Sequence, residues 1–175
     1  ARRAAQTTMY YILDALVKIL TPMISFTAEE IWSAMNRTEK ENVESPMLAD
    51  YPVPNDEWDN KEIAEKWEKI IKVKNIVAKD LELARAEKTI GNSLDAKVTI
   101  YAEGEEYKFL KENEELIKLV LIVSGLEIQE NNRKQEEKLG VKVEHATGEK
   151  CERCWMYNDH LEDGLCPRCK EVLEK

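Results

Sequence analysis

Apolar side chains recur every three or four residues near the start of the chain, which predicts a helix with one buried face. The apolar positions of this first helix are Met9, Ile12, Leu13, Leu16, Ile19 and Leu20. Pro22 is expected to end it. A second helix is expected to begin at Thr27, with the Thr27 hydroxyl as its cap and Glu30 reaching back to the Thr27 amide. Ile31, Trp32 and Met35 supply its apolar side.

The segment 36–56 shows no sustained period and contains three of the prolines, so it is predicted to be a long connecting loop. From 57 to 88 the apolar residues return to helical spacing and predict the longest helix of the chain. Both Trp32 and Trp67 fall on apolar helix faces and are expected in the core.

Strand patterns appear only after Gly91 and Asn92, which are expected to break the long helix. Residues 96–102 alternate like a half-buried strand, and 107–124 return to a helical pattern that Gly125 would end. Short strands are predicted at 126–129 and 141–143. The chain is therefore predicted to be mainly α, with a small sheet in its later part.

The 175 residues suffice for one medium domain, or for one domain with a small added module. No apolar run approaches the roughly 20 residues of a membrane span, and the amphipathic first helix does not resemble a signal peptide, so neither a membrane nor export is expected. The sequence lacks an initiator Met and opens within a helical pattern, which indicates a piece of a longer protein.

The formal net charge of -9 argues on composition alone against a nucleic-acid partner, because phosphate contacts need Lys and Arg. The charges are unevenly distributed, however: residues 57–88 carry eight acids and eight bases, whereas 103–137 carry ten acids and five bases. A local contact surface can therefore still be neutral or basic.

The four cysteines form two CxxC pairs near the carboxyl end, Cys151 with Cys154 and Cys166 with Cys169. Two such pairs can direct four thiolates at one centre, which predicts a single structural Zn²⁺ with no open coordination position. Two disulfides and an iron–sulfur cluster are the alternatives. His160 lies between the pairs and is expected to be a solvated loop residue rather than a ligand. His145 is expected at the surface.

Three stretches carry a family resemblance. TPMISFTAEEIW (21–32) resembles a segment of the helical anticodon-binding domain of class I aminoacyl-tRNA synthetases. EKTIGNSLDAKVTIY (87–101) is similar to the passage from long helix to strand in isoleucyl-tRNA synthetases, and GEKCERCWMY (148–157) resembles their zinc finger. The first stretch also suits valyl and leucyl enzymes, and a related finger occurs in formamidopyrimidine-type DNA glycosylases. Their combination, in the expected order, favours the bacterial isoleucyl family.

The resemblance implies a class I anticodon-binding helical bundle, followed by a small α/β region and a four-cysteine zinc finger. The expected divisions are 1–93 for the helical domain, 94–146 for the α/β subdomain and 147–175 for the finger.

Members of this family attach isoleucine to its tRNA in the cytoplasm with the use of ATP. Their HIGH and KMSKS signatures are absent from these residues, so no catalytic residue is expected here and ATP would belong to a catalytic domain outside this sequence. The expected role of these residues is to bind the anticodon stem and loop of a tRNA with an isoleucine anticodon. A monomer is expected.

The resemblance also implies that Arg153 and Trp155 of the finger approach the anticodon, and Arg168 in the second CxxC pair adds another guanidinium. RNA loops are commonly bound by stacking on aromatic rings and by basic side chains at phosphates. Two alternatives stay open: Trp155 packs over the metal as a small core, and both arginines are solvated charges. At the level of the whole chain, the alternative is a stand-alone zinc-stabilised module that binds protein or DNA.

Overall fold

The computed structural model describes residues 2–36, 43–131 and 139–174. The chain divides into two compact units, Ala1–Asn60 and Lys61–Lys175. It is rich in helix, with a small sheet and a four-cysteine cluster, as the sequence predicts. Within the described ranges, no helix is both long enough and apolar enough to cross a membrane.

The first unit is built on helices α1 (Arg2–Leu20) and α2 (Ser25–Ala34). Its small core consists of Val17, Ala28 and Trp32. Trp32 is only 1% exposed and its Nε1 donates to the Val43 carbonyl at 3.0 Å, which confirms the predicted core position. The predicted buried face of α1 is wrong for this unit: Met9, Ile12, Leu13, Leu16 and Ile19 are exposed.

Helix α2 begins two residues earlier than predicted, so Thr27 lies inside it and is not its cap. The Ala28 amide already donates to the Ile24 carbonyl at 2.9 Å, which closes the first helical turn before Thr27 could cap it. Ile24 occupies the capping position and makes no side-chain hydrogen bond there. The predicted capping box is therefore wrong.

The predicted connecting loop is interrupted by the 3-10 turns η2 (Pro46–Leu48) and η3 (Asp56–Trp58), and its residues 37–42 lie outside the described residues. Helix α3 (Lys61–Ala86) begins four residues later than expected. The cause is local, because the Asn55 side chain accepts a hydrogen bond from the Glu57 amide and stabilises the 3-10 turn instead.

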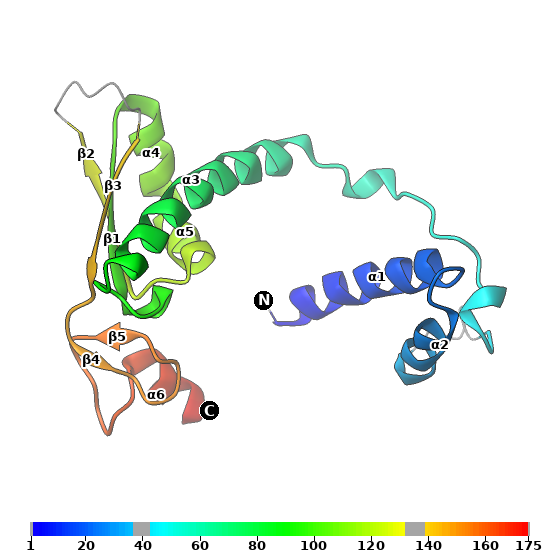
Figure 1. Ribbon diagram of the computed structural model, residues 1–175. Helices are drawn as coiled ribbons and strands as arrows, with labels where there is room; N and C mark the ends of the chain where they lie inside the picture. Colours follow the sequence, from blue (N-terminus) through cyan, green and yellow to red (C-terminus); the bar gives the residue numbers. More distant parts are fainter. Residues whose placement is uncertain (1, 37–42, 132–138, 175) are drawn as a thin grey trace. The chain divides into compact units, whose positions relative to one another are not determined.

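The second unit contains a three-stranded sheet with β1 (Ala96–Ala102) between β2 (Gly125–Glu130) and β3 (Leu139–His145) (Figure 1). β1 runs parallel to β2 and antiparallel to β3, so that Val98 lies opposite both Leu126 and Val143. The 3-10 turn η4 (Ser93–Asp95) leads into β1. All three predicted strands are confirmed.

Helices cover this sheet and complete its core. α3 packs against β3 and α5 (Glu114–Leu121), while α4 (Gly104–Glu112) and α5 pack against β2. The buried stripe of α3 begins at Ile70, so Trp67 precedes the region where α3 meets the core. Trp67 is 39% exposed, and the prediction that it lies in the core is wrong.

The single helix predicted over 107–124 is divided into α4 and α5 at Asn113. The buried Asn113 side chain donates to the Phe109 carbonyl at 2.8 Å, and its backbone leaves the helical region with φ -112° and ψ 16°. α5 then ends at Ile122, in left-handed geometry. Gly125 begins β2 instead of ending the helix, and a Cβ there would lie 2.9 Å from the Lys97 side chain.

Candidate metal centre

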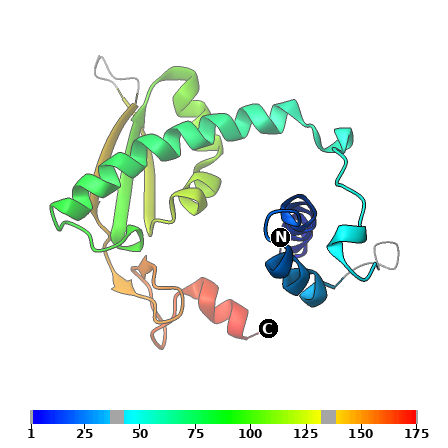
Figure 2. The same ribbon diagram turned by 45° about the vertical axis from the view of Figure 1, so that its right-hand side comes forward.

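All four cysteines lie in a small substructure at the carboxyl end of the second unit, which we call the cysteine module (residues 147–174). It comprises the hairpin β4 (Glu149–Lys150) and β5 (Tyr157–Asn158) and the short helix α6 (Pro167–Leu173). Figures 1 and 2 show this orange and red segment beyond one end of the sheet, following β3.

The cysteine sulfurs converge on one point. All four lie within 4.8 Å of one another, and the sulfurs of Cys154 and Cys166 are 3.7 Å apart. Tetrahedral metal–sulfur bonds of about 2.3 Å require sulfur separations of roughly 3.8 Å, whereas a disulfide needs about 2.05 Å. All four thiols are free. The cluster is therefore positioned to bind a metal ion and contains no disulfide.

Backbone amides face the sulfurs. The Cys166 amide donates to the Cys151 sulfur at 3.3 Å. Hydrogen bonds from the amides of Cys154 and Cys166 lower the pKa of Cys151 to about 6. Burial raises the pKa of Cys154 to about 12, because several thiolates cannot share a desolvated site without a compensating cation. A bound metal ion supplies that compensation, so this donor set fits a cation.

The two histidines lie outside this cluster. His160 is exposed, as predicted, and only its backbone amide is engaged, with the Asn158 side chain. His145 does have a partner: its ring meets the Tyr157 ring edge-on, with centroids 5.1 Å apart. His145 is exposed, as predicted, and it contacts the cysteine module through this ring pair.

Trp155 projects from the first CxxC turn into solvent and is 61% exposed. Its backbone is left-handed, with φ 64°, and its amide donates to the Cys151 carbonyl at 2.9 Å. The small core of the module is formed instead by the cysteines with Leu161 and Leu165. The alternative in which Trp155 covers the metal site is wrong.

Lys150 lies close to the Trp155 and Tyr157 rings and also to Asp95. Neither Lys150 nor Asp95 was predicted as a site residue. The Lys150 Nζ lies 5.7 Å from the Trp155 ring centroid and 6.0 Å from that of Tyr157. It is also 3.8 Å from Asp95 Oδ1, while Asp95 Oδ2 accepts from the amides of Gly91 and Asn92. The Asn92-x-x-Asp95 capping box is the sequence signal that would have identified Asp95.

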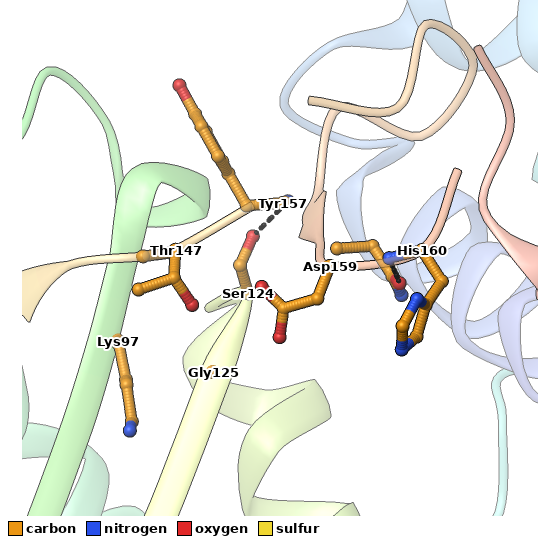
Figure 3. A pocket seen from close by; sticks show the side chains of 9 residues that line it. Lys97, Ser124, Gly125, Thr147, Tyr157, Asp159 and His160 are labelled. Carbon is orange, nitrogen blue, oxygen red and sulfur yellow. Dashed lines mark hydrogen bonds between the residues drawn. The ribbon is translucent and has the colours of Figure 1, made fainter. Parts of the chain in front are cut away.

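Ser124 joins the sheet to the cysteine module, and no sequence pattern marks it. Its hydroxyl donates to the Leu94 carbonyl. The same hydroxyl accepts from the Tyr157 amide at 2.7 Å (Figure 3). A cavity of about 280 Å³ on this side is lined by polar residues that include Lys97, Thr147 and Asp159.

The two predicted arginines occupy different places. Arg153 is exposed. Burial raises the pKa of Cys169, and the Arg153 side chain opposes that rise. Arg168 is exposed and lines a second cavity, of about 740 Å³, between α5 and the cysteine module. Trp155 and Arg153 do not line that cavity.

Comparison with known proteins identifies the family. Residues 1–100 match the model of the anticodon-binding domain of tRNA ligase. The isoleucine–tRNA ligase of Caldicellulosiruptor saccharolyticus is 48% identical over 99% of this chain. Those of Caldanaerobacter subterraneus subsp. tengcongensis and Geobacter sulfurreducens are 43% and 38% identical, also over 99% of this chain. The chain covers 19%, 20% and 20% of these three relatives, about a fifth of their length. The resemblance to isoleucyl-tRNA synthetases is thereby confirmed, and the chain belongs to the anticodon-binding domain family of tRNA ligases.

Proposed function

We propose that this chain is the anticodon-binding portion of an isoleucine–tRNA ligase and that it binds the anticodon stem and loop of isoleucine tRNA. The intact ligase would attach isoleucine to that tRNA with ATP, in the cytoplasm and as a monomer. The chain contributes binding and positioning, while ATP is bound by a catalytic domain outside it. The relatives named above support this proposal, because each is an isoleucine–tRNA ligase that aligns with 99% of the chain.

The bound metal in this proposal is one structural Zn²⁺, held by Cys151, Cys154, Cys166 and Cys169. Four thiolates with no additional ligand suit tetrahedral zinc, and a closed shell leaves no position for a substrate. The ion would hold the module together, since so few apolar residues support it.

The proposed divisions are those expected from the sequence: a helical domain at 1–93, an α/β subdomain at 94–146 and a zinc finger at 147–175. In this scheme α1 and α2 belong to a class I helical bundle. The long helix α3 would serve as the shared element, since it packs on the sheet.

The proposed RNA contacts are Arg153, Trp155 and Arg168. The single observation that carries this assignment is the exposed Trp155 ring, held outward by a left-handed backbone at the first CxxC turn. An exposed indole next to the Lys150 ammonium can stack on an unpaired base while the cation faces phosphate.

The experiment is a titration of the zinc-loaded chain with isoleucine tRNA and with a non-cognate tRNA at two salt concentrations. Loss of one stacked base costs roughly 1–3 kcal/mol, so Trp155→Ala should weaken cognate binding about tenfold. Trp58→Ala is the control, since Trp58 is similarly exposed but lies in a 3-10 turn of the other unit. Equal weakening by both variants, or none by Trp155→Ala, would contradict the assignment.

The alternative of a stand-alone protein- or DNA-binding module has less support. A resemblance to the zinc finger of DNA glycosylases would explain only the cysteine module. The ligase relatives, by contrast, match along 99% of the chain. Preference for duplex DNA over tRNA in the same titration would favour that alternative.

A further inference from the structure

The larger cavity of the second unit, about 740 Å³, lies between α5 and the cysteine module. We call it the α5 cavity and define it by Leu94, Lys118, Leu119, Ile122, Met156 and Arg168. Its volume lies in the range of pockets that hold one small organic ligand. Both walls belong to the same compact unit, so the cavity is a property of that unit.

The walls of the α5 cavity are largely apolar and incompletely covered. Leu119 is 65% exposed and Ile122 is 62% exposed, while Leu94 and Met156 are half-buried. Ile122 also has φ 56°, which is rare for a β-branched residue, and it ends α5 there. Large apolar side chains at the mouth of a cavity provide surfaces against which a flat ring can pack.

Two cations border these apolar walls. Lys118 is half-buried and Arg168 is exposed, and neither forms an ion pair within the described ranges. In a chain of net charge -9, this cavity brings together two basic groups, neither of which forms an ion pair with the Glu115 carboxylate that also lines it. A partly desolvated ammonium is stabilised by a nearby anion, and a guanidinium presents paired donors that match phosphate oxygens.

The cavity also carries groups that can recognise the polar edge of a base. Glu115 contributes a carboxylate, which accepts hydrogen bonds from amino and imino groups, and Asn158 contributes an amide. An apolar slot with a cationic rim and hydrogen-bonding groups beside it matches a nucleotide, which combines a flat ring, a polar edge and a phosphate. A ligand that was only an anion would leave the apolar walls unused.

We propose that the α5 cavity binds one unstacked nucleotide of the RNA, at a site separate from Trp155. The base lies between the Leu119 and Ile122 side of α5 and Met156 of the cysteine module. Lys118 and Arg168 contact its phosphate, and Glu115 or Asn158 reads its edge. The inference rests on the proposed function, because the nucleotide comes from the bound tRNA loop.

This site gives Arg168 a role different from that of the Arg153 and Trp155 pair. Arg168 shares its cavity with Lys118, whereas Arg153 and Trp155 do not line that cavity and the Trp155 ring lies next to the Lys150 ammonium. Two unpaired nucleotides are then held by different faces of the cysteine module. The hydrogen bonds of Ser124 to Leu94 and Tyr157 connect three residues that line the α5 cavity.

The test follows methyl signals in nuclear magnetic resonance spectra of the zinc-loaded chain during titration with a hairpin RNA that carries the isoleucine anticodon loop. The signals of Leu119, Ile122 and Met156 should shift with the same saturation curve as the RNA signals. Leu83 is the internal control, because it is comparably exposed but lies on α3 and does not line the cavity. Inorganic phosphate alone should leave the three cavity methyl signals unchanged.

Two substitutions with matched controls make the test quantitative. Lys118→Ala should weaken RNA binding roughly tenfold, as expected for one charge-assisted phosphate contact. Lys108→Ala should have no such effect, since Lys108 is an exposed lysine on α4 that does not line the cavity. Leu119→Asp, which places a carboxylate in the apolar wall against which the base packs, should weaken binding at least as much as Lys118→Ala, whereas Leu83→Asp should not.

The outcomes separate this inference from the proposed function. RNA binding with unshifted cavity methyls and unchanged affinity of the Lys118→Ala variant would overturn the α5 cavity as a nucleotide site and leave tRNA binding intact. If phosphate alone shifts the cavity methyls as much as RNA does, the site is an anion site and the base-binding part is overturned. A chain that binds no RNA under any condition overturns both proposals.

Discussion

At the scale of single residues, Gly148 gives the most direct prediction. Its φ is 86°, and an added Cβ would lie 2.4 Å from the Asn158 carbonyl oxygen, where only backbone movement could relieve the contact. Gly148→Ala should therefore separate β4 from β5 and weaken zinc binding, in addition to the roughly 1–2 kcal/mol cost of a left-handed Ala. The measurements are the free energy of unfolding and the zinc affinity.

Gly104 is a matched control, because its φ is 57° but no atom lies within 4 Å of its added Cβ. Gly104→Ala should incur only the backbone cost of about 1–2 kcal/mol and leave zinc affinity unchanged. Equal effects of the two substitutions on zinc affinity would show that contact with Asn158 is not what requires glycine at 148.

The sequence predicted some single residues and not others for a physical reason. The four-cysteine cluster was predicted because the spacing of the two CxxC pairs determines which thiols can meet. The roles of Ser124 and Lys150 were not found, because each depends on partners brought together by the fold: Ser124 accepts from Tyr157, and Lys150 approaches Asp95. A pattern in one segment cannot reveal a partner about thirty or more residues away.

At the scale of elements, the cysteine module should depend on its metal more than the sheet does. Its core consists of three buried cysteines with Leu161 and Leu165. The sheet has a larger apolar core, which includes Val98 and Ile100 of β1. Chelation should therefore unfold β4, β5 and α6 while the three-stranded sheet persists. Hydrogen exchange measures this directly.

The Cys151 amide donates to the Met156 carbonyl, and the Cys169 amide donates to the Cys166 carbonyl. Both amides should lose their protection from exchange after chelation. The amides of Val98 and Ile100 should keep theirs. Restoring Zn²⁺ should restore the first set. Loss of protection in β1 at the same chelator concentration would show that the module and the sheet unfold as one cooperative element.

Element boundaries were predicted well where local sequence controls them. The predicted strand 96–102 coincides with β1, because its alternation matches its burial on the sheet. The division at Asn113 was missed, since apolar helical spacing continues across it and the break depends on a side-chain hydrogen bond to Phe109. The start of α2 was misplaced for a similar reason, because the backbone turn after Leu20 already leads into the helix before Thr27.

At the scale of the whole molecule, α1 was predicted correctly as a helix, but the burial of its apolar face was not. The periodic pattern predicted the helix correctly, because periodicity reports which residues avoid water. It could not identify what covers them, and five of the six patterned residues before Pro22 are exposed within their unit. Periodicity therefore predicts that a helix has an apolar face, but the packing partner of that face has to be observed in the structure.

The net charge of -9 should affect how the RNA affinity of this molecule depends on salt concentration. Repulsion from the acidic surface opposes approach, so binding has to come from a few local cations such as Arg168. Binding releases fewer counterions when few phosphates are neutralised, and each single-stranded phosphate contact contributes about 0.7 to the slope of log affinity against log salt concentration. Salt also screens the repulsion. The measured salt dependence of RNA affinity should thus be shallow for a tRNA-binding protein.

Arg168→Gln should make that slope shallower by roughly 0.7, because one phosphate contact is lost. Arg85→Gln is the matched control, since Arg85 is already paired with Glu82 at 2.5 Å and lies on α3. Affinity measured across a salt series with the wild-type chain and both variants gives the three slopes. If Arg168→Gln lowers affinity equally at every salt concentration, Arg168 acts through the shape of the cysteine module and not through a phosphate, and the ionic part of the proposed nucleotide site fails.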